Sequence, residues 1–234
     1  MLKSIFILVL FLLPLTFAQD KATMLVEAAR GNYMPQNTEF VQIDLFQTTH
    51  LDTVRTTNST YIVNLAENFV HAEANRSDGE TLSVNITPER TIAFVNGEKA
   101  DSSLLPFLES TYLGQAPQIV RASQVIPDDY EVVSYNGYVD YGLVAGEEVA
   151  LRHKPPFSSM TTSKFIFDNN ELVAVLGENT LFGTTLTLYD FFGYEGYLRL
   201  NMTLYVYVEE KFELFEERRY DYKFNPQVEA SLFN

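Results

Sequence analysis

Residues 199–208, RLNMTLYVYV, alternate between apolar and polar side chains without a break. One set of alternate positions holds Leu200, Met202, Leu204, Val206 and Val208, and the other holds Asn201, Thr203, Tyr205 and Tyr207. Because successive side chains of a strand point to opposite faces of a sheet, this pattern predicts a β-strand with one buried and one solvated face.

The same period of two recurs along most of the chain. It predicts strands at 41–45, 61–65, 82–86, 92–94, 130–135, 138–141, 148–153, 162–167, 172–176, 184–189 and 212–224. Turn chemistry predicts breaks between strands at Thr57-Asn58-Ser59, Ser77-Asp78-Gly79, Asn96-Gly97 and Asp168-Asn169-Asn170, and a two-residue hairpin at Asn136-Gly137. Gly142 and Gly146 leave a longer connection after this strand open as the alternative. The sequence thus predicts roughly ten antiparallel strands.

Three segments carry helical patterns instead. Residues 21–31 place Met24, Leu25, Ala28 and Ala29 on one helical face, which predicts a short amphipathic helix. Residues 101–113 form a more apolar helical insert between strands, and 118–123 allow a second short helix. The expected fold class is α+β, with one large antiparallel curved sheet, an N-terminal helix and a mid-chain helical lid.

The N-terminus is typical of a secretory signal peptide. Lys3 is followed by an apolar run over 5–13, then by Pro14 and the small residues of Thr16-Phe17-Ala18. The run is shorter than the roughly 20 residues that span a bilayer. We therefore expect a signal peptide over 1–18 and a single exported domain over 19–234. The chain has no cysteine, so this domain depends on burial rather than disulfides.

The charge excludes some partners. Lys and Arg number 16 against 31 Asp and Glu, which gives a net charge of −15. Such a chain repels nucleic acid and anionic lipid surfaces at long range, so no nucleic-acid partner is expected. Four Asn-x-Ser/Thr motifs would accept glycans in a eukaryotic secretory pathway, at Asn58, Asn75, Asn85 and Asn201.

No catalytic motif stands out. His50, His71 and His153 lack metal-ligand spacing and there is no thiol, so neither a metal nor a cofactor is expected. There is no Gly-x-Ser-x-Gly elbow and no phosphate-binding glycine loop. Glu147-Glu148 would point to opposite faces of a strand. A carboxylate pair drawn from distant strands stays open, but we expect a protein without enzymatic activity.

Apolar side chains exceed what one sheet face needs. The chain has 18 Phe and 14 Tyr, and the 165–167 strand is apolar on both faces. A curved sheet covered by two apolar helices readily leaves an apolar cavity. The predicted lining is Val41, Ile43, Leu45, Val63, Leu65, Val84, Ile86, Phe94, Met202, Leu204 and Val206, and the predicted lid is Leu104, Leu105, Phe107, Leu108 and Tyr112.

The order of segments resembles a known family. A leader and a short helix precede the strand 40–46, followed by 61–69 (YIVNLAENF) and 92–97 (IAFVNG) before the lid, then 165–172 (FIFDNNEL) and the closing Phe224-Asn225-Pro226. This order is similar to periplasmic lipoprotein carriers of the LolA type and to the lipid-binding domains of RseB-like sensors. The resemblance implies an open, half-closed β-barrel whose helical lid shelters acyl chains. The carriers typically have an Arg-Pro that is tied to cargo handling where this chain has Leu65-Ala66, and this is the point at which the resemblance departs.

Three functions follow as hypotheses. The first is a soluble, monomeric, periplasmic or secreted carrier of lipid or acylated protein that exchanges cargo with membrane-associated donor and acceptor proteins. The second is a periplasmic sensor or protein-interaction module on the same fold. The third is a eukaryotic secreted glycoprotein of lipocalin-like use.

Overall fold

The computed structural model describes residues 18–29, 34–50, 53–67, 69–110, 112, 126, 130–154, 162–179, 181–194, 196–229 and 232. The chain forms two compact units. The first unit comprises Met1–Gly31, Val125–Tyr189 and Tyr205–Glu213, and the second comprises Asn32–Gln124, Asp190–Leu204 and Leu214–Asn234.

One open antiparallel sheet of thirteen strands dominates the described chain, which confirms the predicted fold class. Two helices accompany it, at residues 18–29 and 105–110. The strands are β1 (Phe40–His50), β2 (Val54–Asn64), β3 (Phe69–Arg76), β4 (Thr81–Ile86), β5 (Thr91–Val95), β6 (Glu98–Lys99), β7 (Tyr130–Asp140), β8 (Ala145–His153), β9 (Ser163–Asp168), β10 (Glu171–Asn179), β11 (Gly183–Tyr194), β12 (Tyr197–Val208) and β13 (Lys211–Phe224).

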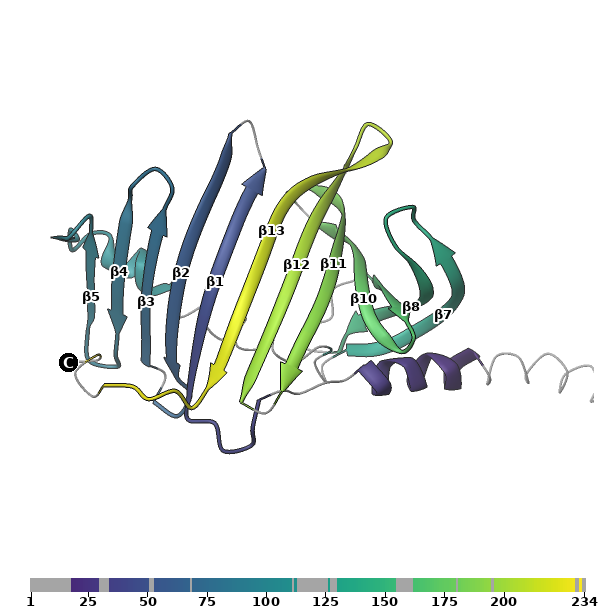
Figure 1. Ribbon diagram of the computed structural model, residues 1–234, viewed down its shortest axis with the longest axis horizontal. Helices are drawn as coiled ribbons and strands as arrows, with labels where there is room; N and C mark the ends of the chain where they lie inside the picture. Colours follow the sequence, from purple (N-terminus) through teal and green to yellow (C-terminus); the bar gives the residue numbers. More distant parts are fainter. Residues whose placement is uncertain are drawn as a thin grey trace, which may run out of the picture. The chain divides into compact units, whose positions relative to one another are not determined.

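The sheet consists of two meanders that meet at its middle. Its order is β6-β5-β4-β3-β2-β1-β13-β12-β11-β10-β9-β8-β7 (Figure 1). Among the described strands, every pair of neighbours is consecutive in sequence except β1 and β13. These two pair from Val41 opposite Phe224 to Thr49 opposite Glu216, so this long-range pairing joins the first strand of the chain to the last one in the middle of the sheet.

Helix 18–29 covers the sheet in the first unit. Its buried face contacts β8, β9 and the start of β10 in a cluster of Ala22, Leu25, Val26, Ala29, Ile126, Val149, Leu151, Phe165, Phe167 and Leu172. On the other face of β8, Gly146 allows a close approach to β9, because a Cβ at this position would come within 2.5 Å of the Phe167 carbonyl oxygen and 3.0 Å of Ile166. A salt bridge of 2.9 Å between Lys21 and Glu147 fastens the polar side of the helix.

In the second unit, strand register gathers apolar residues into rows on one face. One row runs across β1 to β5 as Ile43, Tyr61, Ala72, Val84 and Ala93, all of them buried. Val41, Val63, Val70 and Ile86 form the row on one side of it, and they are buried as well. Alternation therefore produces one continuous apolar face over five strands.

Two predicted turns lie inside strands. Asn136-Gly137 does not close a hairpin: β7 continues to Asp140, and the register shifts between Tyr135 and Gly137. Gly137 has φ of +80°, so it is a β-bulge glycine, and the chain reverses at 141–144 instead. A hairpin at 136–137 would have left much of β8 without its partner.

Thr57-Asn58-Ser59 lies within β2. Asn58 pairs with Phe46 on one side and with Asn75 on the other. Because β1 extends to His50, β2 must begin at Val54 to pair with it. The predicted turns at Ser77-Asp78-Gly79, Asn96-Gly97 and Asp168-Asn169-Asn170 are confirmed.

The predicted helices shift slightly. The first is helical over residues 18–29, three residues before the predicted start at 21, and residues 30 and 31 of the predicted range lie outside the described residues. The insert is helical over 105–110, with residue 112 also helical. The predicted helix at 118–123 and most of the expected signal peptide lie outside the described residues. Over the described ranges, no helix has the length and apolarity required to cross a membrane.

Candidate functional site

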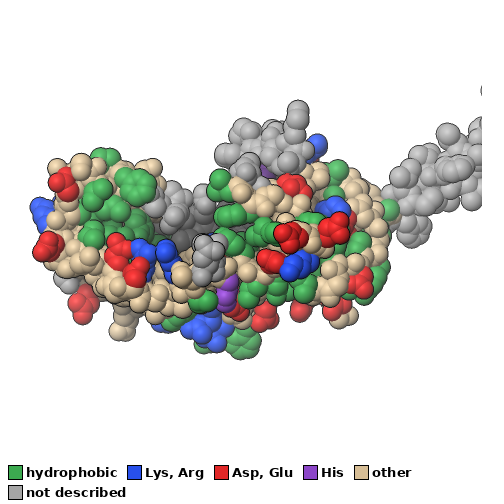
Figure 2. Space-filling view, turned by 90° about the horizontal axis from the view of Figure 1, so that it is seen from above, with side chains coloured by type: hydrophobic (Ala, Val, Ile, Leu, Met, Phe, Trp, Pro, Cys, Tyr) green, Lys and Arg blue, Asp and Glu red, His purple; other side chains and the backbone are tan. Residues whose placement is uncertain are grey.

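A pocket of about 370 Å³ lies on the apolar face of the second unit. Its floor is the row Leu45, Ser59, Ala74, Leu82 and Val95, which crosses β1 to β5 in register. Tyr61 adds to the floor from the neighbouring row, and Leu108 and Tyr112 of the insert complete the lining. Three of the five side chains in this row are small or short, which leaves space beneath the insert. Figure 2 shows hydrophobic side chains gathered over the β2–β5 end of the sheet, with charged side chains at the rim.

The insert is held over this floor by a few contacts. Leu108 is buried, and the Tyr112 ring lies 6.1 Å from the Tyr61 ring. The Thr91 hydroxyl of β5 donates a hydrogen bond of 3.0 Å to the Glu109 carboxylate. Burial raises the pKa of Tyr112 to about 12, with a further contribution from Tyr61. Burial, followed by the nearby Tyr220, likewise raises the pKa of Tyr61. In both residues burial disfavours the charged phenolate and is the main cause of the shift.

One end of the pocket is polar. The next row of the sheet contributes Gln47, Thr57 and Arg76, and Glu80 follows from the β3–β4 turn. The Arg76 guanidinium pairs with Glu80 and, at 2.8 Å, with Asp78. Since the pocket has an apolar floor and a hydrogen-bonding end, it matches an amphiphile better than a purely hydrocarbon ligand.

The structure places the predicted lining residues in different surroundings. Leu45 lines the pocket. Val41, Ile43, Val63, Val84 and Ile86 are buried on the same face beyond it. Leu65 is half-buried in the turn after β2, and Phe94 points to the opposite face and is 41% exposed. On β12, Met202 and Leu204 are half-buried and Val206 is buried, and none of the three lines this pocket.

The predicted lid residues also separate. Leu108 and Tyr112 line the pocket. Leu105 is half-buried, whereas Leu104 and Phe107 are exposed, Phe107 to 68%. A helix of this length can present only part of its circumference to the sheet, so adjacent leucines cannot all face inward.

Sequence reasoning missed the small and polar members of the pocket. Ala74 and Arg76 belong to β3, where His71, Glu73 and Asn75 obscure the apolar period. Tyr61 and Leu82 occupy the apolar positions of the alternating pattern in their strands, so the pattern was sufficient to include both in the predicted lining. Glu80 carries no local signal, because its role depends on the turn that brings it to Arg76.

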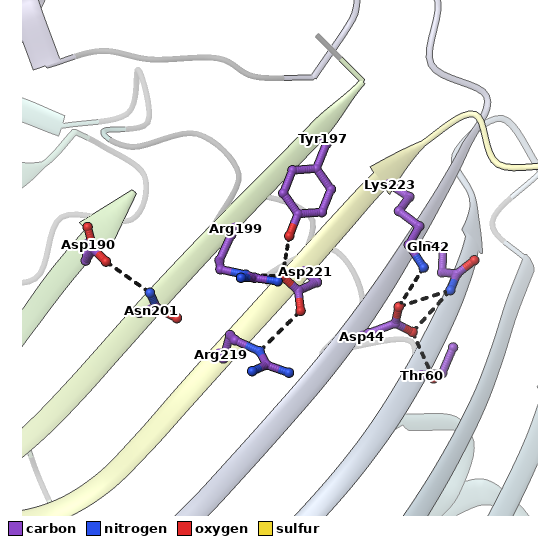
Figure 3. Close-up of polar contacts among 10 residues, drawn as sticks. All are labelled: Gln42, Asp44, Thr60, Asp190, Tyr197, Arg199, Asn201, Arg219, Asp221 and Lys223. Atoms are coloured by element: carbon purple, nitrogen blue, oxygen red, sulfur yellow. Dashed lines mark hydrogen bonds and ion pairs between the residues drawn. The ribbon is translucent and has the colours of Figure 1, made fainter. Parts of the chain in front are cut away.

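The other face of the second unit carries a paired polar network (Figure 3). Asp221 accepts hydrogen bonds of 2.6 Å from both Tyr197 and Arg199, and it forms an ion pair with Arg219 at 3.2 Å. Burial alone would raise the pKa of Asp221, but the hydrogen bonds from Arg199 and Tyr197 and the two guanidinium charges bring it below its ordinary value.

Asp44 forms the second centre of this network. It accepts from Lys223 and from Thr60, each at 3.0 Å, and from Gln42. A more open hollow of about 300 Å³ adjoins the network, lined by Phe46, Thr48, Asn201, Met202, Thr203, Glu217, Arg218 and Arg219. The guanidinium of Arg219, one of the lining residues, lies 4.0 Å from the centre of the Phe46 ring and is therefore engaged within the protein. We therefore regard this face as structural.

Charged groups elsewhere are held in local pairs. Glu147 bonds Lys21 and Tyr135, whereas Glu148 is buried and accepts from Asn136 and Tyr141. His71 is buried against Asn85, with 2.5 Å between its Nδ1 and the amide oxygen. Among the residues that the structure describes, no three His, Asp or Glu side chains come together as a metal site would require.

Comparison with known proteins gives matches among solved structures. No protein-family model matches the chain, and no curated protein matches its sequence. A LolA superfamily protein from Nitrosomonas europaea is 11% identical, with a TM-score of 0.43 over 91% of this chain and 97% of its own. MucB is 9% identical, with a TM-score of 0.24 over 89% and 92%. The Pseudomonas aeruginosa MucA/MucB complex matches at 10% identity, with a TM-score of 0.21 over 88% and 93%. The matching solved structures are thus a LolA superfamily protein and MucB.

Proposed function

We propose that this protein is an exported carrier that shelters the hydrocarbon tail of an amphiphile in the pocket of the second unit. The observation that carries the proposal is the pocket of about 370 Å³ between the row through Ala74 and the insert residues Leu108 and Tyr112. Ligand pockets are typically about 300–1,000 Å³ and mostly apolar with a few polar groups. The volume lies near the lower end of that range, so one tail is the appropriate load.

Partition supplies the binding energy. Each methylene moved from water into an apolar site contributes about 0.8 kcal/mol. A tail of sixteen carbons would therefore offer on the order of 10 kcal/mol before the costs of immobilising ligand and insert, which reduce it considerably. No chemistry on the ligand is required, so the proposed protein binds and releases its cargo without an enzymatic step.

Export to the periplasm belongs to the same proposal and rests on the N-terminal sequence pattern. A carrier in an aqueous compartment would take its cargo from one membrane-associated protein and deliver it to another. The strongly acidic chain supports exchange through protein partners, since its net charge of −15 opposes direct adsorption to an anionic bilayer.

The second candidate is a protein-interaction module, and the β11–β12 hairpin favours it. Phe192 and Tyr194 are 61% and 60% exposed, and the Tyr194 ring stacks on Tyr197 at 5.0 Å. Exposed aromatic side chains are enriched at protein interfaces. Among the structural neighbours, MucB has been solved in complex with MucA. An interaction module of this kind should be purified without lipid, whereas a carrier purified gently should retain some.

The test compares two adjacent residues of the insert. Leu108→Glu places a charge in the pocket, whereas Phe107→Glu places the same charge on a side chain that is 68% exposed. Native mass spectrometry would detect co-purified lipid, and displacement of the fluorescent probe N-phenyl-1-naphthylamine would measure affinity. We expect Leu108→Glu to weaken probe binding at least about tenfold, a change of some 1.4 kcal/mol, and Phe107→Glu to leave it nearly unchanged.

The proposal would be abandoned if the wild-type protein bound neither lipid nor the probe. It would also fail if both variants bound like wild type, because the pocket would then have no part in binding. Thermal unfolding of each variant shows whether the protein is still folded.

A further inference from the structure

The residues at the polar end of the pocket indicate which kind of head group its ligand carries. Its apolar floor ends at the row through Leu45 and Ala74, and the next row holds Gln47, Thr57 and Arg76. Successive rows on one face lie two residues apart, about 7 Å along the strand. We propose that the ligand is a single-tail amphiphile with an uncharged head group that carries hydroxyl or amide groups. This inference rests on the proposed carrier function and specifies its ligand.

Arg76 is the cation that lines the pocket, and its charge is already compensated. Glu80, also in the lining, accepts a hydrogen bond from the Arg76 guanidinium, and Asp78 lies 2.8 Å from it. The β3–β4 turn fixes this arrangement: the Arg76 amide donates to the Glu80 carbonyl at 2.9 Å, and Asp78 accepts from the Glu80 amide at 3.2 Å. Two carboxylates on one guanidinium leave this end of the pocket with a net negative charge.

Another cation on this face, Arg218, is compensated as well. Arg218 stands opposite Gln47 in the β1–β13 register and forms a two-pronged bond with Glu216, at 2.7 and 2.8 Å. Gln47 donates to the same carboxylate, which is buried. Burial opposes the charge of Arg218, but the bond to Glu216 and the neighbouring charges raise the pKa of the guanidinium overall. The pair is therefore a stable ionic contact, so Arg218 offers no free positive charge to a ligand.

An anionic head group would consequently lose water without gaining a counter-charge. It would meet Glu80, which lines the pocket, and like charges in a partly dry site are disfavoured. An uncharged head group avoids this cost and finds suitable partners. Thr57 and Ser59 each offer a hydroxyl that can donate or accept, and Gln47 adds an amide oxygen. Among the described residues that line the pocket, hydrogen-bonding capacity is therefore present without a free positive charge, and this combination favours a hydroxyl- or amide-bearing head group.

The test uses two ligands with the same tail, 1-lauroylglycerol and laurate, at pH 8, where laurate is ionised. Each displaces N-phenyl-1-naphthylamine from the full-length mature protein. We expect lauroylglycerol to bind about tenfold more tightly than laurate. The double variant Asp78→Asn/Glu80→Gln releases Arg76, and the asparagine keeps the acceptor of the turn. This variant should bind laurate about tenfold more tightly than wild type and lauroylglycerol within about threefold of it.

The matched control is Glu67→Gln/Glu89→Gln, which removes two exposed carboxylates from other turns of the same unit and makes the same change in net charge. It should leave both affinities unchanged. If laurate binds wild type as tightly as lauroylglycerol, or if the control raises laurate affinity as much as the test variant does, the head-group inference is overturned while the carrier function stands. If lauroylglycerol, laurate and the probe all fail to bind, the carrier function fails and the inference fails with it.

Discussion

The two units use the same device, a helix laid on an apolar sheet face, with opposite results. In the first unit, helix 18–29 buries four side chains against Phe165, Phe167 and their neighbours, and the cluster is packed. In the second unit, the described part of the insert contributes Leu108 and Tyr112 to a face whose rows contain Ala72, Ala74 and Ala93. The difference teaches that a pocket arises where small strand residues meet a short helix.

This comparison predicts its largest effect for two leucines, one on each helix. Leu25 is 1% exposed inside the packed cluster, whereas Leu108 borders the pocket. Leu25→Ala should lower the free energy of unfolding by about 3–4 kcal/mol, because it removes contacts on all sides. Leu108→Ala should lower it by only about 1 kcal/mol, since its neighbours already leave space. Urea denaturation measures both values, and equal losses would mean that the second face is as tightly packed as the first.

The opposite change, from small to large, separates the units next. Ala174 is 0% exposed and packs with Ile166 and Leu186 in the first unit, so Ala174→Phe should destabilise the protein by about 1–3 kcal/mol through overpacking. Ala74 lines the pocket, so the same substitution should occupy free space and change stability by less than about 1 kcal/mol.

Ala74→Phe should nevertheless reduce displacement-measured binding of N-phenyl-1-naphthylamine at least about tenfold, whereas Ala174→Phe should not. Unfolding and binding are thus expected to respond to different alanines. The comparison would break down if Ala74→Phe weakened folding as much as Ala174→Phe and left binding intact.

Much of this contrast could be predicted from sequence, because alternation is a local property. The pattern at 199–208 indicates β12, and the patterns at 41–45 and 82–86 place Leu45 and Val84 on the apolar face. The helical period of the insert placed Leu108 and Tyr112 on one side, and both line the pocket. For Phe94, alternation alone does not tell which face of the sheet the side chain occupies. The pairing of Phe94 with Ser83 puts it on the face opposite to the pocket.

The polar end of the pocket could not be predicted in this way. Arg76, Glu80 and Thr57 come together through the register of β2 with β3 and through the β3–β4 turn, which are long-range or turn-specific features. Asn136-Gly137 shows the same limit: the dipeptide favours a hairpin locally, but the pairing of β7 with β8 along their length converts it to a bulge. A dipeptide can favour a turn locally, but whether the turn forms depends on how the flanking strands pair.

The smallest expected difference between the units is in how their stability depends on acid pH. Each unit has a carboxylate that holds two of its elements together. Glu147, which holds helix 18–29 through Lys21, and Asp221, which joins β12 and β13 in the second unit, both have pKa values below their ordinary range, because the hydrogen bonds and cations outweigh burial. A depressed folded-state pKa stabilises the protein above the unfolded-state value, near 4, and that stability is lost as the pH falls through the folded-state pKa.

Asp221 is the more buried and has two guanidinium partners. Asp221→Asn should therefore cost about 1–2 kcal/mol at pH 7, and Glu147→Gln less than about 1 kcal/mol. Urea unfolding at pH 7 and pH 3 should show that both differences from wild type shrink in acid, whereas differences that stay constant with pH would mean that neither carboxylate acts through its charge.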